Sequence, residues 1–239
     1  MAAETGVTDQ DRLSRVTGTF AANRAANRPR SICSICVDLL GVSATCVTLM
    51  NGLTSTPVCA SDDRATRLED LQYSLGEGPS PDAYSRKTPV YEPDLAGHTP
   101  SRWQNFGPSA LQLGTRGVFA FPLHVGASYV GVLTLYQNRP GVLSPTQAAD
   151  GLVVADAIAR SMLRIKSEGD FEVLSDNGSD HGAYRAEFHQ ASGMIAVQLG
   201  IHISEAAVRI RAHAYATDRT VAEVAADIVE RRLRLVDDS

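Results

Sequence analysis

Four cysteines are the residues of this chain whose spacing gives the first test of its chemistry. Cys33 and Cys36 form a C-x-x-C pair, and Cys46 and Cys59 follow after gaps of nine and twelve residues. Four thiolates could close a tetrahedral zinc site, but a zinc ribbon needs two closely spaced pairs. The first pair lies in an apolar helical run and the other two cysteines lie on predicted strands, where cysteine often packs as a small apolar residue. The sequence therefore favours four core cysteines and predicts no metal site.

The sequence also lacks the catalytic motifs of enzymes that act on nucleotides. A cyclase or phosphodiesterase would need paired carboxylates or a His-Asp metal pattern, and the sequence contains neither. We therefore expect no catalytic residue, no cofactor and no enzymatic activity. Phe119, Phe121, Tyr129 and Tyr136 could line a ligand pocket, although aromatic residues at such positions often belong to the core. Both interpretations of the four aromatic residues stay open.

Composition places the chain among ordinary globular proteins. Of its 239 residues, 44% are hydrophobic and 21% are charged, and the formal net charge is −5. No segment approaches the roughly 20 apolar residues that span a bilayer. The N-terminus has no basic stretch followed by an apolar core, so a secretory signal is not expected. These features predict a cytoplasmic protein that has no contact with membranes.

The elements that must position these residues follow from apolar periodicity and turn signals. Asn51-Gly52 and Gly126-Ala127-Ser128 each separate two apolar runs, which is typical of a hairpin. Ser144-Pro145 gives a helix cap followed by proline at the first helical position. Residues 79–116, rich in Pro and Gly, are expected to be largely irregular. The predicted helices cover about 9–26, 30–40, 63–75 and 144–167, and the predicted strands cover 44–50, 54–60, 117–125 and 129–137.

The last sixty residues predict three short helices. The first covers about 181–199 and stops at Gly200, a typical residue after a helix C-terminus. The second follows Ser204 as its N-cap, and the third opens with a capping box from Thr220 to Glu223. Many alanines on the inward faces predict helix axes that approach closely. The predicted units are an N-terminal helix (1–24), a first domain (25–167), an acidic linker (168–180) and a three-helix domain (181–235).

An ordered string of short motifs in this tail resembles the ANTAR domain, a three-helix module that binds RNA hairpins and regulates transcription termination. The string runs Ala191-Ser192-Gly193, Leu199-Gly200-Ile201, Ser204-Glu205-Ala206, Ile210-Arg211, Ala214 and Val224-Ala225. The resemblance covers the whole tail without gaps. It implies structural roles for the small residues of the motif, which are Ala191, Gly193, Ala206, Ala214 and Ala225.

The first domain resembles a GAF domain, a fold that senses small molecules or signals in many bacterial regulators. Three phrases carry the likeness: Leu75-Gly76-Glu77-Gly78-Pro79, Ala120-Phe121-Pro122-Leu123 and the strand 129–136. The likeness covers about residues 25–165. It implies an α+β fold with an antiparallel sheet and flanking helices, followed by a small all-α domain. A GAF domain joined to an ANTAR domain is an arrangement known among actinobacterial regulators.

Residues around the second and third tail helices are the candidates for RNA contact. They are Arg209, Arg211, Tyr215, Arg219 and Thr220. Tyr215 could stack on an unpaired base, and Arg211 and Arg219 flank a short turn. Arg231, Arg232 and Arg234 are expected to matter less, because cations at a helix C-terminus already suit its dipole. Residues 181–235 contain seven arginines and six acidic residues, so charge permits RNA binding but does not show it.

The sequence thus predicts a transcription antitermination regulator in which a GAF domain senses a small molecule or an upstream signalling protein. Its ANTAR domain would bind hairpins in nascent transcripts. A DNA-binding regulator is the first alternative, because three small helices also build helix-turn-helix domains. A GAF-type, thiol-dependent methionine sulfoxide reductase is the second. Apolar residues along the helix at 144–167 exceed what one sheet would cover, which predicts a parallel homodimer.

Overall fold

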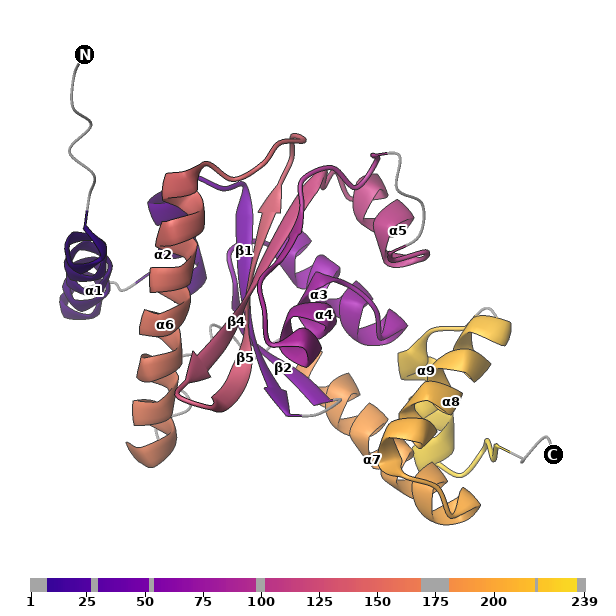
Figure 1. Cartoon of the computed structure of the whole chain (residues 1–239). Coiled ribbons are helices and arrows are strands. Elements are labelled where there is room, and N and C mark those ends of the chain that lie inside the picture. Colours follow the sequence, from indigo (N-terminus) through magenta and orange to yellow (C-terminus); the bar gives the residue numbers. More distant parts are fainter. Residues whose placement is uncertain are drawn as a thin grey trace.

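The computed structural model of the chain describes residues 8–26, 30–51, 54–97, 102–168, 181–217 and 219–235. Figure 1 shows an antiparallel sheet between two groups of helices, with three further helices toward the C-terminus. The predicted α+β class and GAF-like arrangement are confirmed. The strands are β1 (Ala44–Asn51), β2 (Thr54–Ala60), β3 (Val90–Glu92), β4 (Gly117–Val125) and β5 (Ser128–Gln137). The helices are α1 (Asp9–Ala25), α2 (Ile32–Leu40), α3 (Asp63–Leu75), α4 (Pro79–Arg86), α5 (Phe106–Gln112), α6 (Pro145–Glu168), α7 (His181–Leu199), α8 (Ile203–Ala216) and α9 (Val221–Val229).

The sheet has the strand order β2-β1-β5-β4-β3, and every neighbouring pair is antiparallel. Both predicted hairpins form. Asn51 pairs with Thr54 at the end of the first, and Val125 pairs with Ser128 at the end of the second. Gly126 in the second turn has φ +59°, a conformation that glycine adopts without steric cost. The long connection from β2 to β3 carries α3 and α4, which places these helices beside the central strands.

Alternation along the strands divides the core into two layers, because successive side chains point to opposite faces of the sheet. On β5, Leu133 and Leu135 face α1, α2 and α6, whereas Val132 and Tyr136 face α3, α4 and α5. Figure 1 shows the same division, with α2 and α6 on one side of the sheet and α3, α4 and α5 on the other. A site built from strand side chains can therefore use only every second residue.

Helix α6 lies close to the sheet at Gly151. A Cβ added to this glycine would come within 2.7 Å of the Phe121 ring, so the close approach requires glycine. The preceding residue, Asp150, has a buried carboxylate that accepts from Arg12 Nη1 at 2.8 Å and from Arg15 Nη2 at 2.5 Å. These ion pairs hold α1 against α6, on the layer remote from α3 and α4.

The helices α7, α8 and α9 enclose a separate apolar core, and we call this unit the helical tail. Ala191, Ala206, Ala214 and Ala225 are all at most 1% exposed, as expected for closely packed axes. The capping box of α9 forms, with Glu223 N donating to Thr220 Oγ1 at 3.2 Å and Thr220 N donating to Glu223 Oε2 at 2.9 Å. Gly200 ends α7 with φ +66°, in the left-handed conformation expected of a helix stop.

Two details of the tail differ from the sequence prediction. Helix α8 starts one residue before Ser204, because His202 is the N-cap and its Nδ1 accepts from Ser204 N at 3.2 Å. Gly193 is not required for close packing, since a Cβ added to it meets no heavy atom within 4 Å. The tail therefore packs tightly at its alanines but is open at Gly193.

The stretch predicted to be irregular contains α4, β3 and α5, of which the GAF resemblance implied only α4, the helix after the phrase that ends at Pro79. Their shortness and their Pro and Gly content hide the apolar period that longer helices display. The acidic linker predicted at 168–180 falls almost entirely on residues outside the described ranges. No single described helix is long and apolar enough to cross a bilayer, and α7 and α8 meet that test only together, as a pair bent by 107°.

The open position at Gly193 and the closed one at Ala225 predict opposite effects on stability. Gly193→Ala should raise the free energy of unfolding by ~0.5–1 kcal/mol, because glycine weakens a helix interior. Ala225→Leu should lower it by ~1–3 kcal/mol, because the added atoms overpack a fully buried site. Urea unfolding of the full chain measures both, and a loss of stability in Gly193→Ala would contradict the open geometry.

Candidate functional site

A buried carboxylate lies at the centre of the layer between the sheet and α3. Glu69, on α3, is 4% exposed. Its Oε1 accepts from the Tyr136 hydroxyl at 2.7 Å and from Ser80 Oγ at 3.1 Å. The same oxygen accepts from Gln72 Nε2 at 3.1 Å, and Oε2 accepts from Thr48 Oγ1 at 3.1 Å. Four donors from α3, α4, β1 and β5 thus replace the water that the carboxylate loses on burial.

The donors of this network are themselves fixed. Gln72 Oε1 accepts from Ser80 N at 2.7 Å, and Ser80 Oγ lies 2.7 Å from Thr134 Oγ1. Burial, together with the negative charge of Glu69, raises the pKa of Tyr136 well above its usual value. Tyr136 therefore keeps its proton and acts as a donor to Glu69 throughout the physiological pH range.

A cavity of about 280 Å³ adjoins this network. Glu69, Gln72 and Ser80 contribute to its wall from the sheet and its helices α1–α6, which we call the sheet unit, and Arg211 contributes from the helical tail. Further lining residues include Met50, Ser55, Tyr84 and Asp82. The volume suits a small polar molecule, because ligand pockets of roughly 300 Å³ lie at the lower end of the usual range. The cavity is thus a candidate ligand site that borders both units.

The four aromatic residues proposed to line a pocket do not meet in one cavity among the described residues. Phe119 and Phe121 are buried in the layer of α2 and α6, whereas Tyr136 is buried in the opposite layer. Tyr129 lies near the turn between β4 and β5, where its ring is 5.1 Å from that of His124. The strand alternation separates them, and only Tyr136 touches the polar network beside the cavity.

Glu69, Gln72, Ser80 and Thr48 were missed by the sequence interpretation. A signal for two of them was present. Glu69 and Gln72 recur with Ala65 and Leu68 on the inward stripe of α3, where an apolar residue would be expected. A carboxylate on such a stripe indicates a buried polar network, although its partners on β5 and α4 come from distant parts of the chain.

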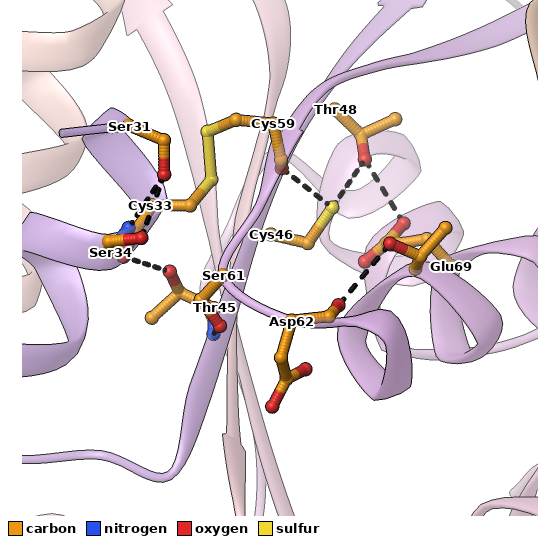
Figure 2. The surroundings of a disulfide bond; sticks show 11 residues. Ser31, Cys33, Ser34, Thr45, Cys46, Thr48, Cys59, Ser61, Asp62 and Glu69 are labelled. Carbon is orange, nitrogen blue, oxygen red and sulfur yellow. Dashed lines mark hydrogen bonds between the residues drawn. A yellow bond between two sulfur atoms is a disulfide. The ribbon is translucent and has the colours of Figure 1, made fainter. Parts of the chain in front are cut away.

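The cysteines are arranged differently from the expectation of four free core residues. Cys33 on α2 and Cys59 on β2 form a disulfide, whereas Cys36 and Cys46 are free and buried. Figure 2 shows this bond and the hydrogen bonds that lead from Cys46 through Thr48 to Glu69. The pairing joins residues 26 positions apart, a long-range contact that spacing alone does not reveal.

Neither free thiol is arranged as a nucleophile. Burial raises the pKa of Cys36 to about 12, so this thiol is almost fully protonated at neutral pH. Cys46 is inaccessible and donates to the Cys59 carbonyl at 3.1 Å. This geometry counts against the thiol-dependent reductase. Among the described residues, no group of His, Cys, Asp and Glu is placed to hold a metal ion.

Arg211 joins the helical tail to the sheet unit. Its Nε donates to the Tyr73 carbonyl at 3.1 Å, in the last turn of α3. Its guanidinium carbon lies 4.9 Å from the Phe188 ring centre and 5.7 Å from that of Tyr73. The last turn of α3 has no basic residue of its own, so Arg211 supplies the cation that suits a helix C-terminus. Gly76, which ends α3 with φ +66°, leaves room for the guanidinium.

The other residues proposed for RNA contact lie on different parts of the tail. Arg209 pairs with Glu205 at 3.0 Å, and Arg219 pairs with Asp227 at 2.6 Å. Thr220 serves as the N-cap of α9. Tyr215 is 75% exposed, and no contact with a described residue fixes its ring as the capping bonds fix Thr220. The structure therefore does not gather the five candidates into a single exposed patch.

Comparison with solved structures agrees with this architecture. The GAF domain of a phosphoenolpyruvate-protein phosphotransferase from Coxiella burnetii is 14% identical, with a TM-score of 0.52, over 67% of this chain and 96% of that one. The sheet and its helices have the GAF fold. The corresponding Acinetobacter domain is 12% identical over 71% of this chain and 99% of its own, with a TM-score of 0.49. No protein-family model and no curated protein matches the sequence.

The Glu69 network yields a prediction about Tyr136. Tyr136→Phe should lower the free energy of unfolding by ~1–3 kcal/mol, because it removes a buried donor to a carboxylate. Tyr91→Phe is the matched control, since Tyr91 is 45% exposed and its hydroxyl bonds to no described residue. The control should change stability by less than ~0.5 kcal/mol. Equal effects of the two substitutions in urea unfolding would show that the Tyr136 hydroxyl does not stabilise Glu69.

The contact of Arg211 with α3 predicts a local change in dynamics. Arg211→Ala should speed amide hydrogen exchange in the last turn of α3, because it removes a charged donor worth ~1–3 kcal/mol. Arg209→Ala, on the same helix, should leave that turn unchanged, since exposed i,i+4 ion pairs contribute about 0.3–0.5 kcal/mol. Identical exchange at α3 in both variants would rule out a stabilising contact between the two units.

Proposed function

We propose that the chain is a sensor–effector regulator in which the GAF-fold unit receives a signal and the helical tail binds RNA hairpins. Capture of a hairpin would prevent a terminator from forming, so the chain acts by binding and needs no catalytic group. The observation that carries the proposal is the separate core of the tail. Its inward alanines occupy the motif positions that resemble the ANTAR domain, and they are buried at the helix contacts.

Signal reception is proposed for the cavity beside Glu69. The cavity is bordered by carboxylate, amide and hydroxyl groups from the sheet unit and by the guanidinium of Arg211. Such a wall favours a small polar molecule that both accepts and donates hydrogen bonds. An upstream protein acting on the sheet unit is the other source of signal that the fold would accommodate.

The DNA-binding alternative has less support. A recognition helix reads bases with exposed polar side chains at its N-terminal end. In α9 that end is engaged in its own capping box, and the Glu223 carboxylate is directed back to Thr220. A carboxylate at this position would also repel phosphate. We therefore prefer RNA as the nucleic acid.

We also propose that the chain forms a homodimer through α6. Leu152 on α6 is 51% exposed, while Val154, Ile158 and Met162 on the same helix are buried against the sheet layer. Pairing of α6 with its copy in a second chain would bring two helical tails together. A cytoplasmic location follows from the proposed binding of nascent transcripts.

The nucleic-acid preference is the decisive test of this function. The full chain should bind hairpin RNAs that share one stem and carry a randomised loop, and it should bind duplex DNA of matched length more weakly. The logarithm of the affinity should fall with the logarithm of salt concentration by ~0.7–0.9 for each phosphate contact. Equal affinity for both nucleic acids, measured by filter binding across salt concentrations, would favour the DNA-binding regulator.

A further inference from the structure

Two arginine side chains at the C-terminal end of the tail have no partner among the residues that the structure describes. Arg209, Arg211, Arg219 and Arg232 all make hydrogen bonds or ion pairs within the chain. The side chains of Arg231 and Arg234 are exposed and form neither a hydrogen bond nor an ion pair with any described residue, although the backbone N–H of Arg231 donates to the Ile228 carbonyl at 3.0 Å. Guanidinium groups without a partner are available to phosphate, which they bind with well-defined geometry. Among the described arginines of the tail, the two without a side-chain partner thus belong to the group that the sequence analysis expected to matter less.

Arg231 also has an unusual backbone. It follows α9 with φ +61°, a left-handed conformation at a position where helices commonly place glycine. Side chains other than glycine are disfavoured there by roughly 1 kcal/mol. A residue held in such a conformation often serves a function that offsets the strain. Here the strained residue carries one of the two available guanidinium groups.

Both arginines border a groove between α7 and the end of α9. The groove has a volume of about 590 Å³. Its floor includes Met194 and Val197, and Gln190 lies beside them on α7. Val197 is 86% exposed, and the open side of Gly193 faces the same space. None of the described residues that line the groove is acidic.

We propose that this groove is the RNA-binding site of the helical tail. An unstacked nucleotide of a hairpin loop would lie on the apolar floor, and the adjacent phosphates would contact Arg231 and Arg234. Loop bases that leave the stack expose a flat apolar face, which thioether and aliphatic side chains can cover. The Gln190 amide can donate and accept at a base edge. This inference rests on the proposed RNA-binding function and identifies the surface that performs it.

The charge pattern favours RNA over a protein segment as the occupant. The guanidinium groups of Arg231 and Arg234 attract an anion to the end of the groove that they line, and no carboxylate among the described lining residues opposes them. An RNA loop supplies one charge per nucleotide together with an apolar base face. An apolar peptide would leave both arginines without a counter-charge.

The experiment uses the full chain and hairpin RNAs with one fixed stem and a randomised loop. Arg231→Gln with Arg234→Gln should weaken binding by at least about 10-fold and flatten the log–log salt dependence by ~1.4–1.8. Arg67→Gln with Arg139→Gln removes the same charge from exposed positions on the sheet unit, and it should change neither quantity. Circular dichroism should show unchanged helix content in both double variants.

Two further variants separate binding from folding. Gly193→Leu should fill the groove and weaken RNA binding with no loss of helix content, since the position is open. Arg231→Gly should raise the melting temperature, because glycine relieves the left-handed strain, and should at the same time weaken RNA binding. A purely structural role for Arg231 would not produce these opposite changes.

The outcomes are distinguishable. If the wild-type chain binds the hairpins and the groove variants bind equally well, the groove is overturned while the RNA-binding function stands. If Arg209→Gln with Arg219→Gln loses as much affinity as the groove pair, the opposite face of the tail shares the contact and the groove is overturned as the site. If the wild-type chain binds no hairpin, the proposed function fails and the groove fails with it.

Discussion

The contact between Arg211 and the last turn of α3 determines how the two halves of this molecule relate to each other. The carbonyls at a helix C-terminus lack partners within the helix, and α3 supplies no basic side chain of its own there. Arg211 reaches the Tyr73 carbonyl from the tail, and its guanidinium lies over the Phe188 ring. The Tyr73 ring packs at 5.3 Å from that of Phe188 and is the sheet unit's contribution to the tail core. Arg211 thus holds the tail against α3 and also borders the cavity beside Glu69, so a molecule bound in that cavity would contact Arg211 directly.

The cavity exists because α3 carries polar side chains where its amphipathic pattern would place apolar ones. Glu69 remains tolerable in the core only because four donors surround it, and these donors come from strands and helices that the sheet topology brings together. The same alternation that delivers Thr134 and Tyr136 to this layer sends Leu133 and Leu135 to the other layer, against α6. The chain therefore has one apolar layer, which holds α1, α2 and α6 to the sheet, and one layer with a polar centre, which is suited to recognition.

The sequence patterns predicted the features that neighbouring residues determine and did not predict the contacts between distant segments. The hairpins, the capping box from Thr220 to Glu223 and the stop at Gly200 are determined by neighbouring residues, and the structure has all of them. The four aromatic residues were grouped by type, but the face that a strand residue occupies depends on its register, so they were divided between layers. The pairing of Cys33 with Cys59 and the partners of Glu69 depend on contacts between distant segments. Gly193 was interpreted through its small size, whereas the geometry around it shows open space.

The arginines of the tail show that position along the sequence is a poor guide to which side chains are available for a ligand. Nearby carboxylates that form ion pairs decide this instead. Arg219 lies in a loop, which suggested that its side chain was available for RNA, but its Nη2 donates to Asp227 Oδ2 at 2.6 Å. Asp227 also binds Arg232, and these two arginines lower the pKa of the aspartate through hydrogen bonds and charge. The side chains of Arg231 and Arg234 form no ion pair with any described residue, and both line the same groove as Gly193. Arg231 lies two residues after the end of α9, and its φ of +61° gives the chain a left-handed turn there. Because no described residue that lines this groove is acidic, the two guanidinium groups determine its local charge.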